Sequence, residues 1–275
     1  MKKDYGLKHL FFLALAIITT GLFLISVFTK QKLSTPTSSE ELFDSKLITL
    51  SSINELSNYV DSVYLKEYMG LFDTMNYVSI TSDLVKKRFT YGLSNYSFND
   101  NWVINLLGRV CWSHITAKVK PDDILSAYDG LCSQQTIVFM EVLKRKGLQV
   151  RTVGLGFPQG PGHFLCEVSY DGQWHLYDVT KEPVWDRAVN KHESMDYYLA
   201  NKDSLYLVYE NRIEKSELTK IITNVHYGKI NEFPAKRMLL LHKLCNVALF
   251  GLPILFWCVY YRARKNSKGT HLEAK

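Results

Sequence analysis

Residues 129 to 180 have the sequence DGLCSQQTIVFMEVLKRKGLQVRTVGLGFPQGPGHFLCEVSYDGQWHLYDVT, which contains one helical pattern followed by three strand patterns. In Ser133–Lys146, apolar side chains recur at i, i+3, i+4 and i+7, the spacing of a helix that packs on a core. Gly147 is typical of the residue that follows such a helix. Cys132 is therefore expected at the helix N-terminus, where free amide hydrogens and the helix dipole favour a thiolate.

Three strands are expected after this helix. Gln149–Gly156 alternates between two faces, and His163–Tyr170 and Gln173–Thr180 flank Asp171-Gly172, a dipeptide typical of a two-residue hairpin turn. The glycine-rich segment Phe157–Gly162 superficially resembles a phosphate loop. It is expected to be a turn between strands, because no helix follows it and no Gly-Lys-Ser/Thr is present.

The register of this hairpin predicts which side chains meet. A two-residue turn at Asp171-Gly172 places Leu165 opposite Asp178, so that His163 and Asp178 share one face as diagonal neighbours, roughly 7–8 Å apart at the backbone. A carboxylate at this position can hold the imidazole tautomer and stabilise its charged form, whereas Asp171 at the turn cannot. Cys166 falls on the opposite face and is a poor candidate for a nucleophile.

The same residues resemble the core of the transglutaminase-like superfamily, within the broader papain-like cysteine-enzyme fold. That family's motifs are Gly-x-Cys at a helix start, a Gly-Leu/Ile-x-x-Arg strand, His-Ala-Trp-x-Glu-Val and Gly-x-Trp-x-x-x-Asp. Here they stand as Gly130–Cys132, Gly147–Arg151, His163–Val168 and Gly172–Asp178. The match is good over residues 129 to 180 and looser from residue 81. Leu165 stands where many members carry Trp, so the substrate face is expected to differ.

The resemblance implies a catalytic triad. Cys132 would attack an acyl carbonyl, His163 would act as general base and then acid, and Asp178 would orient His163. The backbone amide of Cys132 would supply half of an oxyanion hole, and Trp112 and Gln134 are the candidates for a side-chain donor. No metal and no cofactor are implied, since the five cysteines show no CxxC and no Cys/His ligand spacing.

Two apolar segments near the chain ends are each long enough to cross a membrane. His9–Phe28 and Leu244–Tyr261 carry no Asp, Glu, Lys or Arg, and about twenty apolar residues in a helix span the ~30 Å hydrocarbon layer. The alternative for the first is a cleaved signal peptide. Its apolar run is longer than that of such peptides, and no A-x-A-like site follows it, so a retained anchor is favoured.

Basic flanks predict the orientation of these spans. Lysines precede the first span and an Arg/Lys cluster follows the second, which favours both termini in the cytoplasm and the intervening domain outside, although the inner flanks are also basic. The expected organisation is a cytoplasmic N-terminus (1–8), a transmembrane helix (9–28), a linker and helical extension (29–80, with the linker at 30–40), a transglutaminase-like domain (81–237, core 129–180), a second transmembrane helix (240–261) and a cytoplasmic basic tail (262–275).

The remaining segments predict an α+β fold in which N-terminal helices pack on an antiparallel sheet. Two short helices are expected between Leu42 and Met75, with an amphipathic helix on the membrane surface as the alternative. Further helices are expected at Thr81–Thr90 and Asn101–Val119. After a loop at 181–185, a helix near residues 196–199 and a strand at Leu205–Tyr209 are expected to complete the domain.

Charge and composition narrow the function classes. The net charge is +6, but the basic residues concentrate at the chain ends, and no Lys/Arg-rich face with interleaved aromatic residues indicates nucleic-acid binding. Cys111 and Cys166 could pair in an oxidising compartment and leave Cys132 free.

We therefore expect thioester acyl chemistry on an extracytoplasmic peptide, protein or amide-bearing glycan, with hydrolysis favoured over transfer to an amine. A catalytically idle binding or scaffolding module of an envelope or polysaccharide assembly is the alternative.

Overall fold

A computed structural model describes residues 4–29, 42–68, 70–156, 162–181, 191–210 and 212–272. Over these residues the protein is α+β, with ten α-helices, two short 3-10 helices and a four-stranded antiparallel sheet. The expected linker at 30–40, nearly all of the turn at 157–162 and the loop after Lys181 lie outside the described residues. The chain divides into two compact units, one made of residues 1–32, 95–117 and 236–275 and the other of residues 33–94 and 118–235.

The second unit is built on the sheet. Its strands are β1 (Gln149–Leu155), β2 (His163–Tyr170), β3 (Gln173–Tyr177) and β4 (Val225–Tyr227), in the order β3-β2-β1-β4. The expected hairpin register is confirmed, because Tyr170 pairs with Gln173. Asp171 and Gly172 have φ values of 50° and 75°, the two left-handed positions that a type I′ turn requires.

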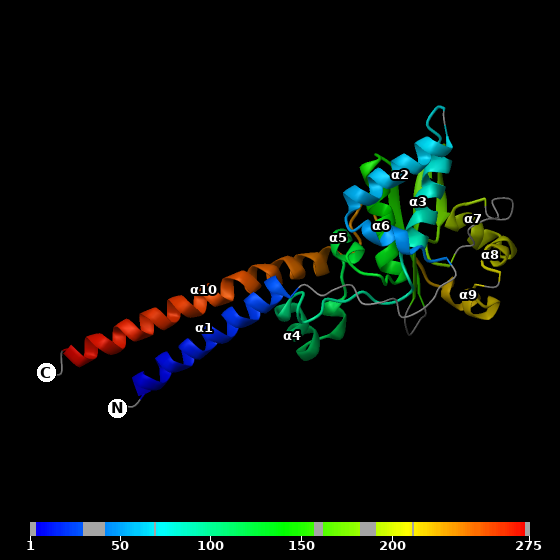
Figure 1. Ribbon diagram of the computed structural model, residues 1–275. Coiled ribbons are helices and arrows are strands. Elements are labelled where there is room, and N and C mark those ends of the chain that lie inside the picture. Colours follow the sequence, from blue (N-terminus) through cyan, green and yellow to red (C-terminus); the bar gives the residue numbers. More distant parts are fainter. Residues whose placement is uncertain are drawn as a thin grey trace. The chain divides into compact units, whose positions relative to one another are not determined.

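Helices cover both faces of this sheet (Figure 1). Alternate strand residues such as Val150 and Val168 pack against one helical layer, whereas Val153 and Leu165 pack against the other. The first layer contains α2 (Ile53–Glu67), α3 (Thr74–Arg88), α5 (Pro121–Leu125) and α6 (Cys132–Arg145), with a 3-10 turn at Ser45–Thr49; the second contains α7 (Met195–Ala200), α8 (Lys202–Val208) and α9 (Lys215–Ile221). The apolar side of α2, including Ile53, Leu56 and Val60, is buried in the first layer, so the alternative of a membrane-surface helix there is wrong.

A buried arginine ties the start of this unit to the rest of it. The Arg88 guanidinium, fully buried at the end of α3, donates to the carbonyl oxygens of Leu50 at 3.2 Å and Ala127 at 3.1 Å, and also to that of Leu125. Its charge is thereby solvated by backbone dipoles in place of water. Burial lowers the pKa of Arg88 to about 10, which leaves the side chain charged at neutral pH.

Two expected elements are wrong. The apolar run Leu205–Tyr209 is not a strand but lies in α8 and its C-cap, and β4 takes the edge of the sheet beside β1. A short apolar run fits a buried strand and a buried helical turn equally well. The continuous helix expected at Asn101–Val119 ends at Val110, and the chain folds back so closely that a Cβ on Gly108 would lie 2.4 Å from Thr116 Cγ2.

The first unit contains two long helices and one short helical segment. In α1 (Asp4–Phe28) and α10 (Lys236–Leu272), the stretches Lys8–Phe28 and Lys236–Asn266 are long and apolar enough to cross a membrane. The two helices lie side by side and antiparallel (Figure 1), with Phe23 against Phe250 and the Trp257 indole donating to Thr20 Oγ1 at 3.1 Å. The short segment comprises α4 (Trp102–Val110) and a 3-10 turn at Ser113–Thr116.

Candidate active site

Cys132 is the first residue of α6, as expected. The residues before it are held to the end of α3, because the Gly130 N–H donates to the Thr90 carbonyl at 2.9 Å and the Thr90 N–H donates to the Tyr128 carbonyl at 3.0 Å. Gly130 permits this approach, since a Cβ at this position would lie 3.0 Å from Gln135 Cγ and 3.2 Å from the Phe89 ring. The thiol is thus fixed at a helix N-terminus, where the first amide hydrogens have no intrahelical acceptor.

His163 and Asp178 meet across the hairpin, as its register predicts. The ladder between β2 and β3 begins at Cys166 and Tyr177, and just beyond it His163 Nε2 lies 2.5 Å from Asp178 Oδ2. Asp178 is 2% exposed, so its charge depends on protein hydrogen bonds.

Both oxygens of Asp178 are occupied. Oδ1 accepts from the Thr180 N–H at 3.0 Å, from the Thr180 hydroxyl at 2.8 Å and from the Lys181 N–H at 3.0 Å. Oδ2 accepts from the Tyr209 hydroxyl at 2.9 Å in addition to its contact with His163. A carboxylate held by this many donors is fixed in position and remains ionised.

The Cys132 thiol completes the group. The His163 side chain and the Phe164 backbone amide both act on this thiol and lower its pKa. Because Asp178 engages His163 Nε2, Nδ1 is the nitrogen left for the thiol. Cysteine, histidine and aspartate therefore stand in the order of nucleophile, base and orienting group.

The charges of the three groups support one another. Burial alone would raise the pKa of Cys132, but the hydrogen bond and charge of His163, together with the Phe164 amide, bring it below its ordinary value. Burial alone would lower the pKa of His163, and the Asp178 charge outweighs it and raises that pKa. Burial likewise opposes ionisation of Asp178, yet the charge and hydrogen bond of His163 hold its pKa well below the usual range. All three shifts favour the charged forms, a thiolate, an imidazolium and a carboxylate, over the neutral ones.

Of the two residues considered as side-chain oxyanion donors, Gln134 has no donor left to offer. Gln134 is 2% exposed, and its amide nitrogen donates to the carbonyls of Ser94 and Lys118, both at 2.8 Å, so neither amide hydrogen is left for a substrate. Its Oε1 accepts from the Leu131 and Ser94 N–H groups. Trp112 belongs to the first unit and is 57% exposed.

Tyr209 is the site residue that sequence reasoning missed. Its side chain is 1% exposed, and its hydroxyl reaches Asp178 from the end of α8. No spacing rule links a tyrosine to an aspartate 31 positions earlier, because the path between them depends on the fold. Thr180 could have been found, since an aspartate commonly caps the backbone two residues further on.

Three motif residues outside the triad form a second cluster. Arg151 Nε lies 2.7 Å from Glu167 Oε2, and the Arg151 guanidinium stacks on the Trp174 ring at 4.4 Å. Glu167 Oε1 accepts from the Met195 N–H at 2.7 Å. These contacts join β1, β2 and β3 to the start of α7, so this part of the sequence pattern has a structural role.

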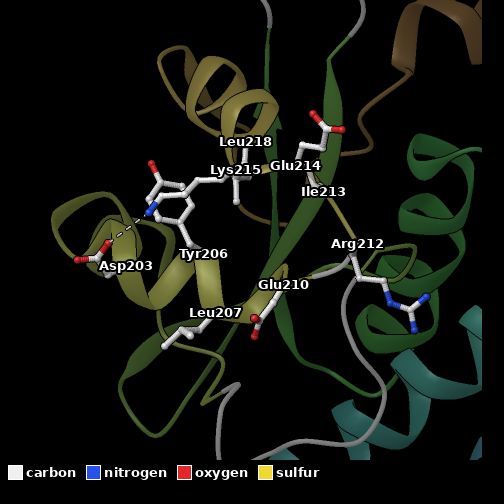
Figure 2. A pocket seen from close by; sticks show the side chains of 9 residues that line it. All are labelled: Asp203, Tyr206, Leu207, Glu210, Arg212, Ile213, Glu214, Lys215 and Leu218. Atoms are coloured by element: carbon white, nitrogen blue, oxygen red, sulfur yellow. Dashed lines mark ion pairs between the residues drawn. The ribbon is translucent and has the colours of Figure 1, made fainter.

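The remaining cysteines and a surface hollow do not extend the site. Cys111 and Cys166 are both free thiols; Cys166 is fully buried, and burial raises its pKa well above the ordinary value. A hollow of about 640 Å³ lies over α8 and α9 (Figure 2), where Lys215 faces Asp203 at 4.0 Å and covers the Tyr206 ring. No triad residue lines it, and its mixed charges indicate a solvated groove.

Comparisons with protein-family models, with curated proteins and with solved structures found no match to this chain. Its function must therefore be argued from the geometry of the site itself.

Proposed function

We propose that this protein is a membrane-anchored, transglutaminase-like cysteine enzyme that forms an acyl thioester on Cys132. The observation that carries the proposal is the triad, in which a buried Asp178 lies 2.5 Å from His163 Nε2 and the same imidazole lowers the pKa of a helix-terminal thiol. Three such residues, separated in sequence and brought to one place, are a more specific signal than any one of them. The Arg151–Glu167–Trp174 cluster, which uses other positions of the same family pattern, supports the resemblance.

The chemistry follows from the charges. The Cys132 thiolate attacks the carbonyl carbon of an amide, and the backbone amides of the first turn of α6 stabilise the developing oxyanion. His163 then donates its proton to the leaving amine as the C–N bond breaks and the thioester remains. Asp178 keeps the imidazole oriented and stabilises its charged form through both steps.

Hydrolysis is the favoured outcome of this intermediate. His163, neutral after the first step, can remove a proton from water as it attacks the thioester, which releases the acid and restores the thiolate. Transfer to an amine would use the same base with a different nucleophile. The substrate proposed is a peptide, a protein or an amide-bearing glycan, and neither a metal nor a cofactor takes part in these steps.

We further propose that α1 and α10 both cross the membrane, with both termini in the cytoplasm and the enzyme unit outside. Their antiparallel packing supports a two-pass arrangement, and the basic residues that flank the apolar stretches toward the two chain ends support the cytoplasmic side. A reporter cysteine near residue 35 tests this orientation in intact cells. Labelling by an impermeant maleimide is expected, and protection from it would contradict the arrangement.

Acylation of Cys132 by a p-nitrophenyl ester tests the enzyme proposal. The full-length protein in detergent should release nitrophenolate in a stoichiometric burst at pH 7, and mass spectrometry should place the acyl group on Cys132. Cys132→Ser should abolish the burst. Cys166 is the internal comparison, because a buried thiol with a raised pKa should stay unmodified.

The pH dependence separates an enzyme from an idle module. Alkylation of Cys132 by iodoacetamide should persist well below pH 8.5, the ordinary titration point of a thiol. His163→Ala should move the midpoint upward, because burial and the Asp178 charge, which remain, both raise the pKa of Cys132. Slow alkylation with an ordinary midpoint, unchanged in His163→Ala, would favour the binding or scaffolding module.

A further inference from the structure

Residues 95–117 present apolar side chains that the first unit does not cover. On α4 and just after it, Leu106 is 50% exposed, Val110 74% and Trp112 57%. The opposite side of the helix is packed, since Ile104 and Gly108 are buried. A helix with one apolar side against protein and another facing outward needs an apolar environment on both sides.

The packed side of this segment rests on the apolar parts of both long helices. Its cluster contains Ile104 and Ile115 together with Cys245 and Leu249 of α10, and Leu22 and Phe23 of α1 lie against it. These α1 and α10 residues are inside the stretches that can cross a membrane. The segment is therefore attached to the spans at the level of their hydrocarbon-compatible residues.

The depth of this attachment follows from the helix rise. Leu22 is six residues before Phe28, the last residue of α1, and at about 1.5 Å per residue this places Leu22 about 9 Å inside the end of the span. Interfacial helices bury their apolar sides about 5–10 Å into the boundary between headgroups and acyl chains. The two depths agree.

Polar groups at the same level are paired within the unit. Asn101 Nδ2 donates to Asn246 Oδ1 at 2.7 Å, and His242 Nε2 lies 2.8 Å from the Ile115 carbonyl oxygen. Asn101 and His242 are 1% and 2% exposed. A polar side chain on a membrane span requires such a partner, because lipid supplies none.

We propose that residues 95–117 form an interfacial element embedded in the membrane leaflet at the Phe28 end of α1, with Leu106, Val110 and Trp112 in contact with lipid acyl chains. The spans to which the segment is attached expose apolar residues too, including Leu24 at 44%, Leu244 at 58% and Val247 at 69%. The exposed Arg109 suits the headgroup layer. This proposal rests on membrane insertion of α1 and α10 and does not depend on catalysis by Cys132.

Fluorescence quenching by brominated lipids tests the proposal on the full-length protein in liposomes. Bimane is attached to Leu106→Cys or Val110→Cys in a background carrying Cys111→Ser, Cys132→Ser and Cys258→Ser. Lipids brominated near the headgroup end of the chain should quench both positions about threefold more than lipids brominated near the terminal methyl, as expected for a shallow interfacial helix.

Two matched positions make the result decisive. Leu24→Cys on α1 is the lipid-facing reference, and Leu65→Cys on α2, 68% exposed in the second unit, is the apolar position expected to face water. Quenching at 106 and 110 should match position 24 and exceed position 65. Quenching at positions 106 and 110 no greater than at position 65 would overturn the proposal. Protection of these positions from both brominated lipid and aqueous iodide would also overturn it, because a protein partner would then cover the helix. Absence of quenching at position 24 would instead contradict the insertion of α1.

Discussion

The two units distribute polar and apolar side chains in opposite ways. In the sheet unit, the apolar residues form two buried layers, and the buried charges of Asp178 and Arg88 are each surrounded by donors or acceptors. In the unit of α1, α4 and α10, large apolar residues such as Val110 and Val247 are exposed, whereas Asn101 and His242 are buried. The first arrangement suits water, and the second suits the membrane insertion proposed for α1 and α10. The buried polar side chains named here are hydrogen-bonded in both units, Asp178 and Arg88 in the sheet unit and Asn101 and His242 in the unit of α1, α4 and α10.

Each unit contains one buried thiol that can report on it separately. Cys166 is 0% exposed in the sheet unit, and Cys245 is 3% exposed in the helical unit. In a Cys111→Ser, Cys132→Ser, Cys258→Ser background, the urea dependence of maleimide labelling at each thiol measures the unfolding of its own unit.

The largest effect is expected at Asp178. Asp178→Asn keeps the size of the side chain but removes the charge that raises the pKa of His163. We expect burst acylation to slow by about 10³–10⁴-fold, as for the loss of the orienting carboxylate in other triads. The basic limb of the pH profile should move to lower pH, because an imidazolium without Asp178 loses its proton more readily. An unchanged profile would mean that His163 and Asp178 do not act together.

The next largest effect is expected at Arg88. Arg88→Ala removes the donor shared by four carbonyls, those of Ile48, Leu50, Leu125 and Ala127, and leaves a cavity. We therefore expect a loss of about 3–5 kcal/mol from the free energy of unfolding of the sheet unit. The labelling transition of Cys166 should shift to lower urea while that of Cys245 stays in place. Arg88→Lys keeps the charge and part of the side-chain volume, so its Cys166 transition should fall between those of the parent protein and Arg88→Ala. Equal shifts at both thiols would show that the units unfold together.

Local chemistry explains which parts of the fold the sequence could predict. Asp171-Gly172 sets a two-residue turn, and that turn alone fixes the register that joins His163 to Asp178. The start of α6 at Cys132 follows equally from helix periodicity and Gly147. These predictions depend on residues close together in sequence, and they are confirmed.

The rest depends on contacts between distant residues. The apolar run at Leu205–Tyr209 is helical because Leu205 and Val208 face one side of the sheet, which the run itself cannot indicate. The role of Gln134 was also hidden, since its amide binds Ser94 and Lys118, 40 and 16 residues away. The membrane contact of residues 95–117 remains a proposal for the same reason, because the apolar spacing of α4 fits a core helix and an interfacial helix equally.

A smaller effect is expected at Tyr209. Tyr209→Phe removes one hydrogen bond to Asp178 Oδ2 and leaves the ring packed, so we expect acylation to slow by about tenfold, corresponding to about 1.4 kcal/mol. Tyr206→Phe is the matched control on the same helix, because its hydroxyl bonds to Thr219 and not to the triad. The Cys166 transition should move little in either variant. Equal acylation rates in the two variants would remove Tyr209 from the positioning of Asp178.

The smallest effect is expected at Asn246 in the helical unit. Asn246→Leu leaves the Asn101 amide without its acceptor, and such contacts between membrane helices contribute only about 0.6–1.7 kcal/mol, because polar groups also find partners in the unfolded chain within lipid. Labelling of Cys245 should begin at slightly lower urea than in the parent, with Cys166 unaffected. Val247→Leu, an exposed neighbour on α10, controls for changes beside the reporter. A loss of unfolding free energy as large as that of Arg88→Ala would mean that the Asn101–Asn246 contact lies in an interior without alternative partners. The helical unit would then resemble the core of the sheet unit more than its exposed apolar surface indicates.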